Sequence, residues 1–151
     1  MPTVIVFIVI FLTVWLQGQI HFVLRPDLVL ILTVILSVKL KKEKAVTWAF
    51  LSGWFSDALF SFGFINTFSK TTVVGLAVFL KKYLMWPEMQ LAAFLVLVIT
   101  PVSKLIEMFL LKGFYSENVP WWPILGVTVI NLILTPLIFY LLDRPIQSEN
   151  E

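Results

Sequence analysis

The chain has no cysteine and only one histidine, His21, among its 151 residues. Without cysteine it can form neither a disulfide nor a thiolate metal site, and thiol catalysis is excluded. Charge is also scarce. Only 13% of the residues are charged and the formal net charge is +2, so the sequence offers no electrostatic footprint for nucleic acid.

Apolar residues dominate the composition. The chain is 60% hydrophobic and 15% aromatic, which is more apolar surface than a soluble domain of this length can bury. We therefore predict an all-α integral membrane protein. The gaps between the apolar runs are short, which predicts one bundle without a soluble domain. No basic residue precedes the first run and no small-residue cleavage site follows it, so we expect a retained first helix.

The apolar runs predict six membrane-crossing helices. The first, roughly 33 Å long, is sufficient for the roughly 30 Å hydrocarbon core of a bilayer. The second is short, roughly 23 Å, and crosses only where the bilayer is thin or protein neighbours shield it; a re-entrant segment is the alternative. The expected helices are 3–24, 26–40, 45–62, 67–84, 87–111 and 121–142, followed by a polar tail at 143–151.

Lysines concentrate between the second and third expected helices. An excess of Lys and Arg in short loops marks the cytoplasmic side of a membrane protein. With six crossings both termini are cytoplasmic, and seven basic residues lie inside against three outside. Attraction to anionic lipid explains the loop cluster as well, and contact with cytoplasmic filaments is the alternative. The cluster is Lys39, Lys41, Lys42 and Lys44; Lys81, Lys82 and Arg144 share its side, and Arg25, Lys70 and Lys112 lie opposite.

A stripe of small residues runs along the third expected helix. Ala45, Ala49 and Gly53 are four residues apart, and Asp57 continues the same face. Such a stripe lets two helices approach closely, either within the bundle or with the transmembrane helix of a partner. A charge in the hydrocarbon layer costs about 2.5–3.5 kcal/mol on insertion scales, so Asp57 is expected to face the bundle interior in both cases.

Two further charges lie deep in the fifth expected helix. Lys104 and Glu107 are three residues apart and share a face. Counting the helical rise places Asp57 and Lys104 at the same depth. We predict an ion pair between them, with Glu107 as the competing partner of Lys104. In the alternative, Lys104 pairs only within its own helix and Asp57 bonds hydroxyls such as those of Ser52 or Ser56.

The sequence carries no arrangement typical of an enzyme. Intramembrane hydrolysis needs an activated nucleophile, a histidine metal site or two carboxylates that share a proton. Asp27 and Asp143 fall at opposite ends of the expected bundle, which leaves Asp57 without a second aspartate. No phosphate-binding loop, HExxH or GxSxG motif occurs. We predict no enzymatic activity and no cofactor, and we expect His21 to anchor a helix end at the membrane interface rather than bind a metal.

Three short motifs, in this order and spacing, are similar to those of a known family. They are Arg25-Pro26-Asp27 at the start of the second helix, Gly53-x3-Asp57 with Gly63 downstream, and Asn131-x3-Thr135-Pro136 before a short charged tail. In this respect, and in its length and six-crossing layout, the chain resembles the MreD family, small membrane proteins that determine the rod shape of bacteria.

The resemblance implies a non-enzymatic scaffold subunit of the cell-elongation machinery, which synthesises peptidoglycan at the inner membrane. It implies binding to MreC and a place near MreB, RodA and a penicillin-binding transpeptidase. It also implies a fold similar to the substrate-binding subunits of energy-coupling-factor vitamin transporters, so a vitamin-binding subunit is the rival interpretation. Such subunits typically dock their partner through an Ala-x3-Ala patch on the first helix. Since residues 3–24 contain no alanine, the scaffold is preferred.

Overall fold

The structure is a computed structural model that describes residues 3–20, 24–60 and 63–146, with side chains as far as Asp143. Those residues form six α-helices, as the all-α prediction requires. The helices are α1 (Thr3–Gln19), α2 (Leu28–Lys39), α3 (Lys42–Phe60), α4 (Ile65–Lys81), α5 (Glu88–Tyr115) and α6 (Pro123–Ile146).

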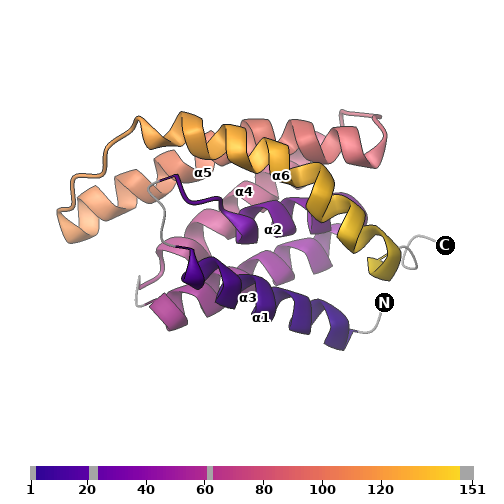
Figure 1. Ribbon diagram of the computed structural model, residues 1–151, viewed down its shortest axis with the longest axis horizontal. Coiled ribbons are helices and arrows are strands. Elements are labelled where there is room, and N and C mark those ends of the chain that lie inside the picture. The colour runs from indigo at the N-terminus through magenta and orange to yellow at the C-terminus, as the bar shows by residue number, and fades with distance from the viewer. Residues whose placement is uncertain (1–2, 21–23, 61–62, 147–151) are drawn as a thin grey trace.

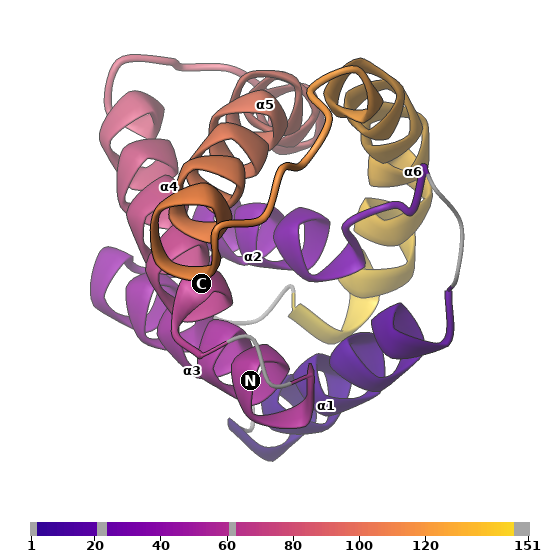
Figure 2. The ribbon, with the colours of Figure 1, turned by 90° about the vertical axis from the view of Figure 1, so that its left-hand side faces the viewer.

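Helix α2 is the core of the molecule. Successive helices alternate in direction, so that α1 begins and α6 ends at the same end of the bundle (Figure 1). Seen along the bundle, α2 lies in the middle and the other five helices surround it (Figure 2). Helix α2 contacts all five, and each of its residues from Val29 to Lys39 is buried.

The sequence of α2 explains its position. Leu, Val and Ile occupy all sides of this helix, and a helix that is apolar all round is buried on all sides. Asp27 caps its start, because the Asp27 side chain accepts a hydrogen bond from the Leu30 backbone N–H at 3.0 Å. With 12 residues, α2 is about 18 Å long, so the prediction of a short second helix is confirmed.

Two of the outer helices combine an apolar composition with the length of a membrane span. Of the described helices, α5 and the Pro123–Asp143 part of α6 are long and apolar enough to cross a membrane, while α1 and α2 are apolar but shorter. Both long helices continue through their internal prolines, Pro101 and Pro136. One face of α6 exposes large apolar side chains at successive four-residue steps, Leu125, Val129, Ile133, Leu137 and Leu141.

Several helix boundaries differ from the predicted ones. Helix α3 begins at Lys42 rather than residue 45, α5 continues to Tyr115 rather than 111, and α6 continues to Ile146, past the predicted start of the tail at 143. The predicted boundaries coincide with charged residues, but Lys, Glu and Arg favour helix and extend readily into solvent from a helix end. Helix α1 ends earlier than predicted, at Gln19. The predictions for His21 and for the end of the tail, 147–151, lie outside the described residues.

Helices α3 and α4 approach each other closely at Gly53. A Cβ atom at this position would lie only 2.6 Å from the Thr67 Cα of α4. Ala45 and Ala49, earlier in the same stripe, are buried inside the chain. The stripe therefore packs against other helices of the same chain and leaves no exposed surface for a partner helix at these three residues. Gly63 has a φ of +67° in the α3–α4 turn, a conformation that favours glycine.

We predict that Gly53→Ala destabilises the bundle. The added methyl group has to push α4 away, and overpacking of this kind typically costs about 1–3 kcal/mol. The measurement is the midpoint of thermal unfolding of the purified protein in detergent. Gly75→Ala is the matched control, because a Cβ at Gly75 meets nothing within 4 Å. Equal midpoints for the two variants would show that the close approach is not required.

Candidate functional site

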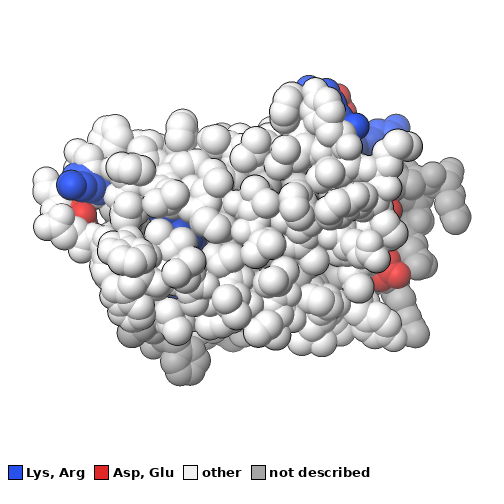
Figure 3. Space-filling view, turned by 90° about the horizontal axis from the view of Figure 1, so that it is seen from above, with Lys and Arg blue, Asp and Glu red and all other residues white. Residues whose placement is uncertain are grey.

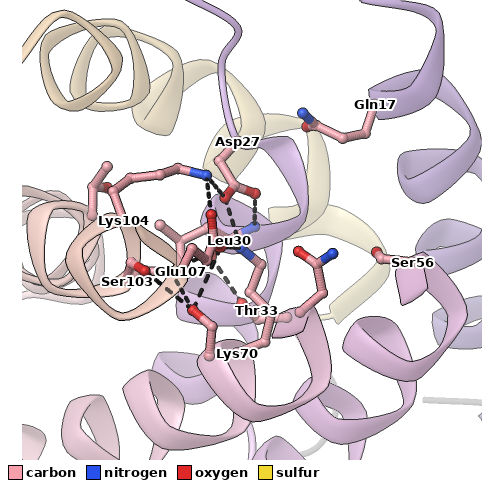
Figure 4. A network of polar contacts seen from close by, with 12 residues as sticks. Gln17, Asp27, Leu30, Thr33, Ser56, Lys70, Ser103, Lys104 and Glu107 are labelled. Carbon is pink, nitrogen blue, oxygen red and sulfur yellow. Dashed lines mark hydrogen bonds and ion pairs between the residues drawn. The ribbon is translucent and has the colours of Figure 1, made fainter. Parts of the chain in front are cut away.

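Four buried or partly buried charges form a closed ring at the start of α2, which we call the charge ring (Figure 4). Lys70 of α4 donates to the Asp27 carboxylate at 2.6 Å and to Glu107 of α5 at 3.1 Å. Lys104 of α5 donates to the same Asp27 oxygen at 2.8 Å and to Glu107 at 2.9 Å. Positive and negative groups alternate, and their formal charges cancel.

The ring is largely removed from solvent. The side chains of Lys70, Asp27 and Glu107 are 2%, 7% and 15% exposed, and Lys104, the outermost, is 24% exposed. A buried charge is tolerated only when it is paired, and removing one partner of a buried pair costs about 3–5 kcal/mol. The ring therefore fixes the relative positions of α2, α4 and α5.

Local sequence places each member of the ring. Asp27 is the N-cap of α2. Lys70 lies three, four and seven residues before Val73, Val74 and Ala77, which are buried in α4, so the helical repeat carries the lysine onto the same inner face. Lys104 and Glu107 are neighbours on one face of α5 because they are three residues apart.

Hydrogen bonds to the backbone around Asp27 bring in two more helices. Asn131 of α6 accepts a hydrogen bond from the Asp27 backbone N–H at 2.9 Å. The Gln17 side chain of α1 accepts from the Leu28 N–H at 2.7 Å and donates to the Pro26 carbonyl at 2.8 Å. The turn before α2 is thus held by α1, α4, α5 and α6 together.

Asp57 joins α3 to the start of α4. Its two carboxylate oxygens accept from the backbone N–H groups of Asn66 and Thr67, at 3.0 and 2.8 Å, and from both of their side chains, at 3.0 and 2.7 Å. Phe64, the N-cap of α4, makes no side-chain cap. Asp57 therefore supplies from another helix the acceptor that the free N–H groups of α4 need.

The predicted ion pair between Asp57 and Lys104 is wrong, whereas the pairing of Lys104 with Glu107 is confirmed. The helical rise gives depth along each helix correctly, but it does not give the direction in which a side chain points. Asp57 turns to the start of α4, and Lys104 turns to Asp27. The alternative of Asp57 bonding to Ser52 or Ser56 also fails, because those hydroxyls donate to backbone carbonyls within α3.

Two ring members were not among the predicted site residues. From the sequence, Asp27 is expected at one end of the bundle, and Lys70 is expected among the basic residues on the non-cytoplasmic side. Both carried a usable signal. Asp27 follows a proline and precedes a long apolar run, which is typical of an N-cap, and Lys70 shares the helical face of the buried valines of α4.

A cavity of about 170 Å³ adjoins the charge ring. Gln17, Asn66 and Arg25 line it together with the four ring residues. Its volume is suited to a few water molecules or a small ion, whereas pockets for larger organic ligands typically measure about 300–1,000 Å³. Within the described part of the chain, no cluster of His, Asp and Glu suited to a metal ion occurs.

Lys39, itself buried, forms a second ion cluster with two more exposed carboxylates at the other end of α2. Its ammonium lies 2.6 Å from Asp143 and 3.2 Å from Glu88, and 4.5 Å from the centre of the Phe139 ring. The sequence counted Lys39 as a loop lysine, but it is only 4% exposed. Helix α2 thus has a carboxylate at its N-terminus and an ammonium at its C-terminus, the arrangement that its dipole favours.

No family model, no curated protein and no solved structure matches this chain. The resemblance to the MreD family therefore rests on its motif residues. Four of these, Asp27, Gly53, Asp57 and Asn131, lie at the contacts between helices described above.

We predict strong coupling within the charge ring. Lys70→Met leaves two carboxylates with one lysine and should destabilise the protein by about 3–5 kcal/mol. Adding Glu107→Gln leaves a single Asp27–Lys104 pair, so the double variant should lose clearly less than the two single variants combined. The free energy of unfolding of the four proteins in detergent measures this coupling.

Lys112→Met is the control, since Lys112 is an exposed lysine of the same helix as Lys104. It should change the free energy of unfolding by no more than about 0.5 kcal/mol. Additive effects of Lys70→Met and Glu107→Gln would contradict the ring.

Proposed function

We propose that the chain is an integral membrane protein whose six helices all cross the bilayer. Two of the described helices are long and apolar enough for this on their own. Seen from one side, the molecule has a broad uncharged surface between its two ends, interrupted by one basic patch (Figure 3). Helix α2 is too short to span the hydrocarbon core by itself, but its five neighbours enclose it and shield it from lipid. Backbone at membrane depth is tolerated where protein covers it.

The distribution of exposed lysines supports cytoplasmic termini. Lys39 and Lys70 are held in ion clusters and no longer count as loop charges. Among the basic residues whose side chains the structure describes, five others lie at the end where α1 begins, against two at the opposite end, and this bias supports a cytoplasmic position for the former end. The five are Lys41, Lys42, Lys44, Lys81 and Lys82, and the two are Arg25 and Lys112.

Within the membrane, the function that we propose is that of an MreD-type scaffold in bacterial cell elongation. It would be a non-enzymatic subunit that binds MreC, close to MreB, RodA and a penicillin-binding transpeptidase. The observation that carries this proposal is the use of the motif residues. Asp27, Gly53, Asp57 and Asn131 each join one helix to another. Because these residues hold the helices in fixed positions, they also fix the outer helix faces. Such fixed faces are what a scaffold needs in order to bind its partners.

The face for MreC then has to be an outer one. Helix α1 exposes Phe7, Ile8, Phe11 and Leu12, and α6 exposes the apolar stripe that begins at Leu125. The Phe7 and Phe11 rings also pack edge-on against Phe55 of α3, with centroids 6.0 and 5.7 Å apart. Either face can receive a single transmembrane helix through van der Waals packing.

The rival function is that of a vitamin-binding transporter subunit. The cavity beside the charge ring favours it, because charged and amide groups converge there. Its volume of about 170 Å³ falls below the usual range for ligands of that size, so the scaffold remains our first choice.

We predict that MreC co-purifies with the tagged chain from bacterial membranes. Ile8→Trp on α1 and Ile133→Trp on α6 form a matched pair of bulky changes at exposed isoleucines, and the one that loses MreC marks the docking face. In cells depleted of their own MreD, the unaltered chain should restore rod shape. A stably inserted chain that retains no MreC, or that binds a vitamin tightly, would overturn the scaffold proposal.

A further inference from the structure

A second hollow, of about 370 Å³, opens at the end of the bundle opposite to the charge ring. It lies where α2 and α4 end and α3 begins. Lys41, Lys42, Lys81 and Lys82 line it, with Leu40 and Val78 among the apolar lining residues. We call this hollow the lysine pocket.

The lysine pocket is not neutralised by the protein in the way that the charge ring is. No Asp or Glu is found among the described residues that line it. The side chains of Lys41, Lys42 and Lys82 are exposed and make no hydrogen bond or ion pair within the described part of the chain. Of the acids at the same end of the bundle, Glu88 and Asp143 bind Lys39, with Glu88 also attracting Lys81, and Glu43 lines a different hollow together with Lys44. The pocket therefore has a positive charge available for an external anion.

One of the four lysines is held in place. The Lys81 ammonium donates to the carbonyl oxygens of Ser37, at 3.2 Å, and of Val38 at the end of α2. An ammonium has three donors, so Lys81 keeps one for a ligand. Helix α3 begins at Lys42, and the free N–H groups of a helix start also favour an anion.

The walls of the pocket suit an amphiphile. Leu40 and Val78 give it an apolar side, and Phe79, next to Val78 in α4, exposes its ring to the surroundings. If the bundle crosses the membrane as proposed, the pocket lies at the level of the cytoplasmic headgroups. Basic pockets between transmembrane helices on that side are suited to phosphorylated lipid headgroups.

We propose that the lysine pocket binds the headgroup of an anionic phospholipid, with the phosphate among the lysines and the acyl chains along the apolar surface beside it. This differs from a general attraction of basic loops to the membrane, because it requires one defined site. The inference rests on the membrane placement in the proposed function and is independent of binding to MreC.

The experiment is a titration of the purified full chain in neutral detergent, followed by native mass spectrometry. The probes are phosphatidylglycerol, phosphatidylcholine and free glycerol phosphate. Each lysine near an anionic lipid contributes about five-fold in affinity. Lys41→Gln with Lys82→Gln should therefore weaken the binding of phosphatidylglycerol about thirty-fold. Arg25→Gln with Lys112→Gln, an equal charge change at exposed residues of the other end, should leave it within about two-fold.

Preference for phosphatidylglycerol over phosphatidylcholine, lost only in the pocket variant, is the expected result. Equal loss in the two double variants would show diffuse attraction and overturn the proposal. Glycerol phosphate binding as tightly as phosphatidylglycerol would also overturn it, because the site would then belong to a soluble phosphate compound. Thermal unfolding of each variant shows that the bundle is intact. A failure to bind lipid leaves the MreC result unaffected, so the two proposals fail separately.

Discussion

The buried carboxylate of Asp27 has to be neutralised inside the bundle, and this requirement determines how the helices meet. Asp27 caps α2 and receives Lys70 from α4 and Lys104 from α5. Glu107 balances the two lysines, while Asn131 and Gln17 hold the backbone on either side. A single turn of chain thereby collects contacts from five helices, and none of those contacts can be lost without leaving a buried polar group unpaired.

The same principle closes the far end of α2, where Lys39 meets Glu88 and Asp143. Between these two ion clusters the helix is packed on all sides, and its only polar side chains, Thr33 and Ser37, donate to backbone carbonyls of α2 itself. Because α2 is too short to cross a bilayer unaided, the enclosure and the paired ends have to act together. The result is a bundle whose interior is held by paired charges and whose outer helix faces expose many large apolar side chains.

The sequence predicted the number of helices, the interior position of Asp57, the shortness of α2 and the Lys104–Glu107 pair, because hydrophobic runs and helical spacing are local properties. It did not predict that Asp57 caps α4 or that Lys104 reaches Asp27. Those contacts depend on which helices lie side by side and on how each helix is rotated about its axis. The sequence pattern of a single helix gives neither its neighbours nor its rotation. Lys39 and Lys70 were predicted as exposed loop lysines, but both lie in ion clusters. The sequence cannot distinguish these cases, because a lysine near a helix end can extend into solvent or enter a buried ion pair.

We have proposed that α2 is enclosed in a membrane-crossing bundle, with the charge ring near the outer side and the Lys39 cluster near the cytoplasm. The most direct measurement uses the absence of native cysteine, which makes any introduced thiol the only one. Lys112→Cys and Lys82→Cys are labelled in cells with a membrane-impermeant maleimide. We expect labelling at 112 in intact cells and at 82 only after permeabilisation. Labelling of both from the same side, or release of the chain from membranes by alkaline carbonate, would contradict this arrangement.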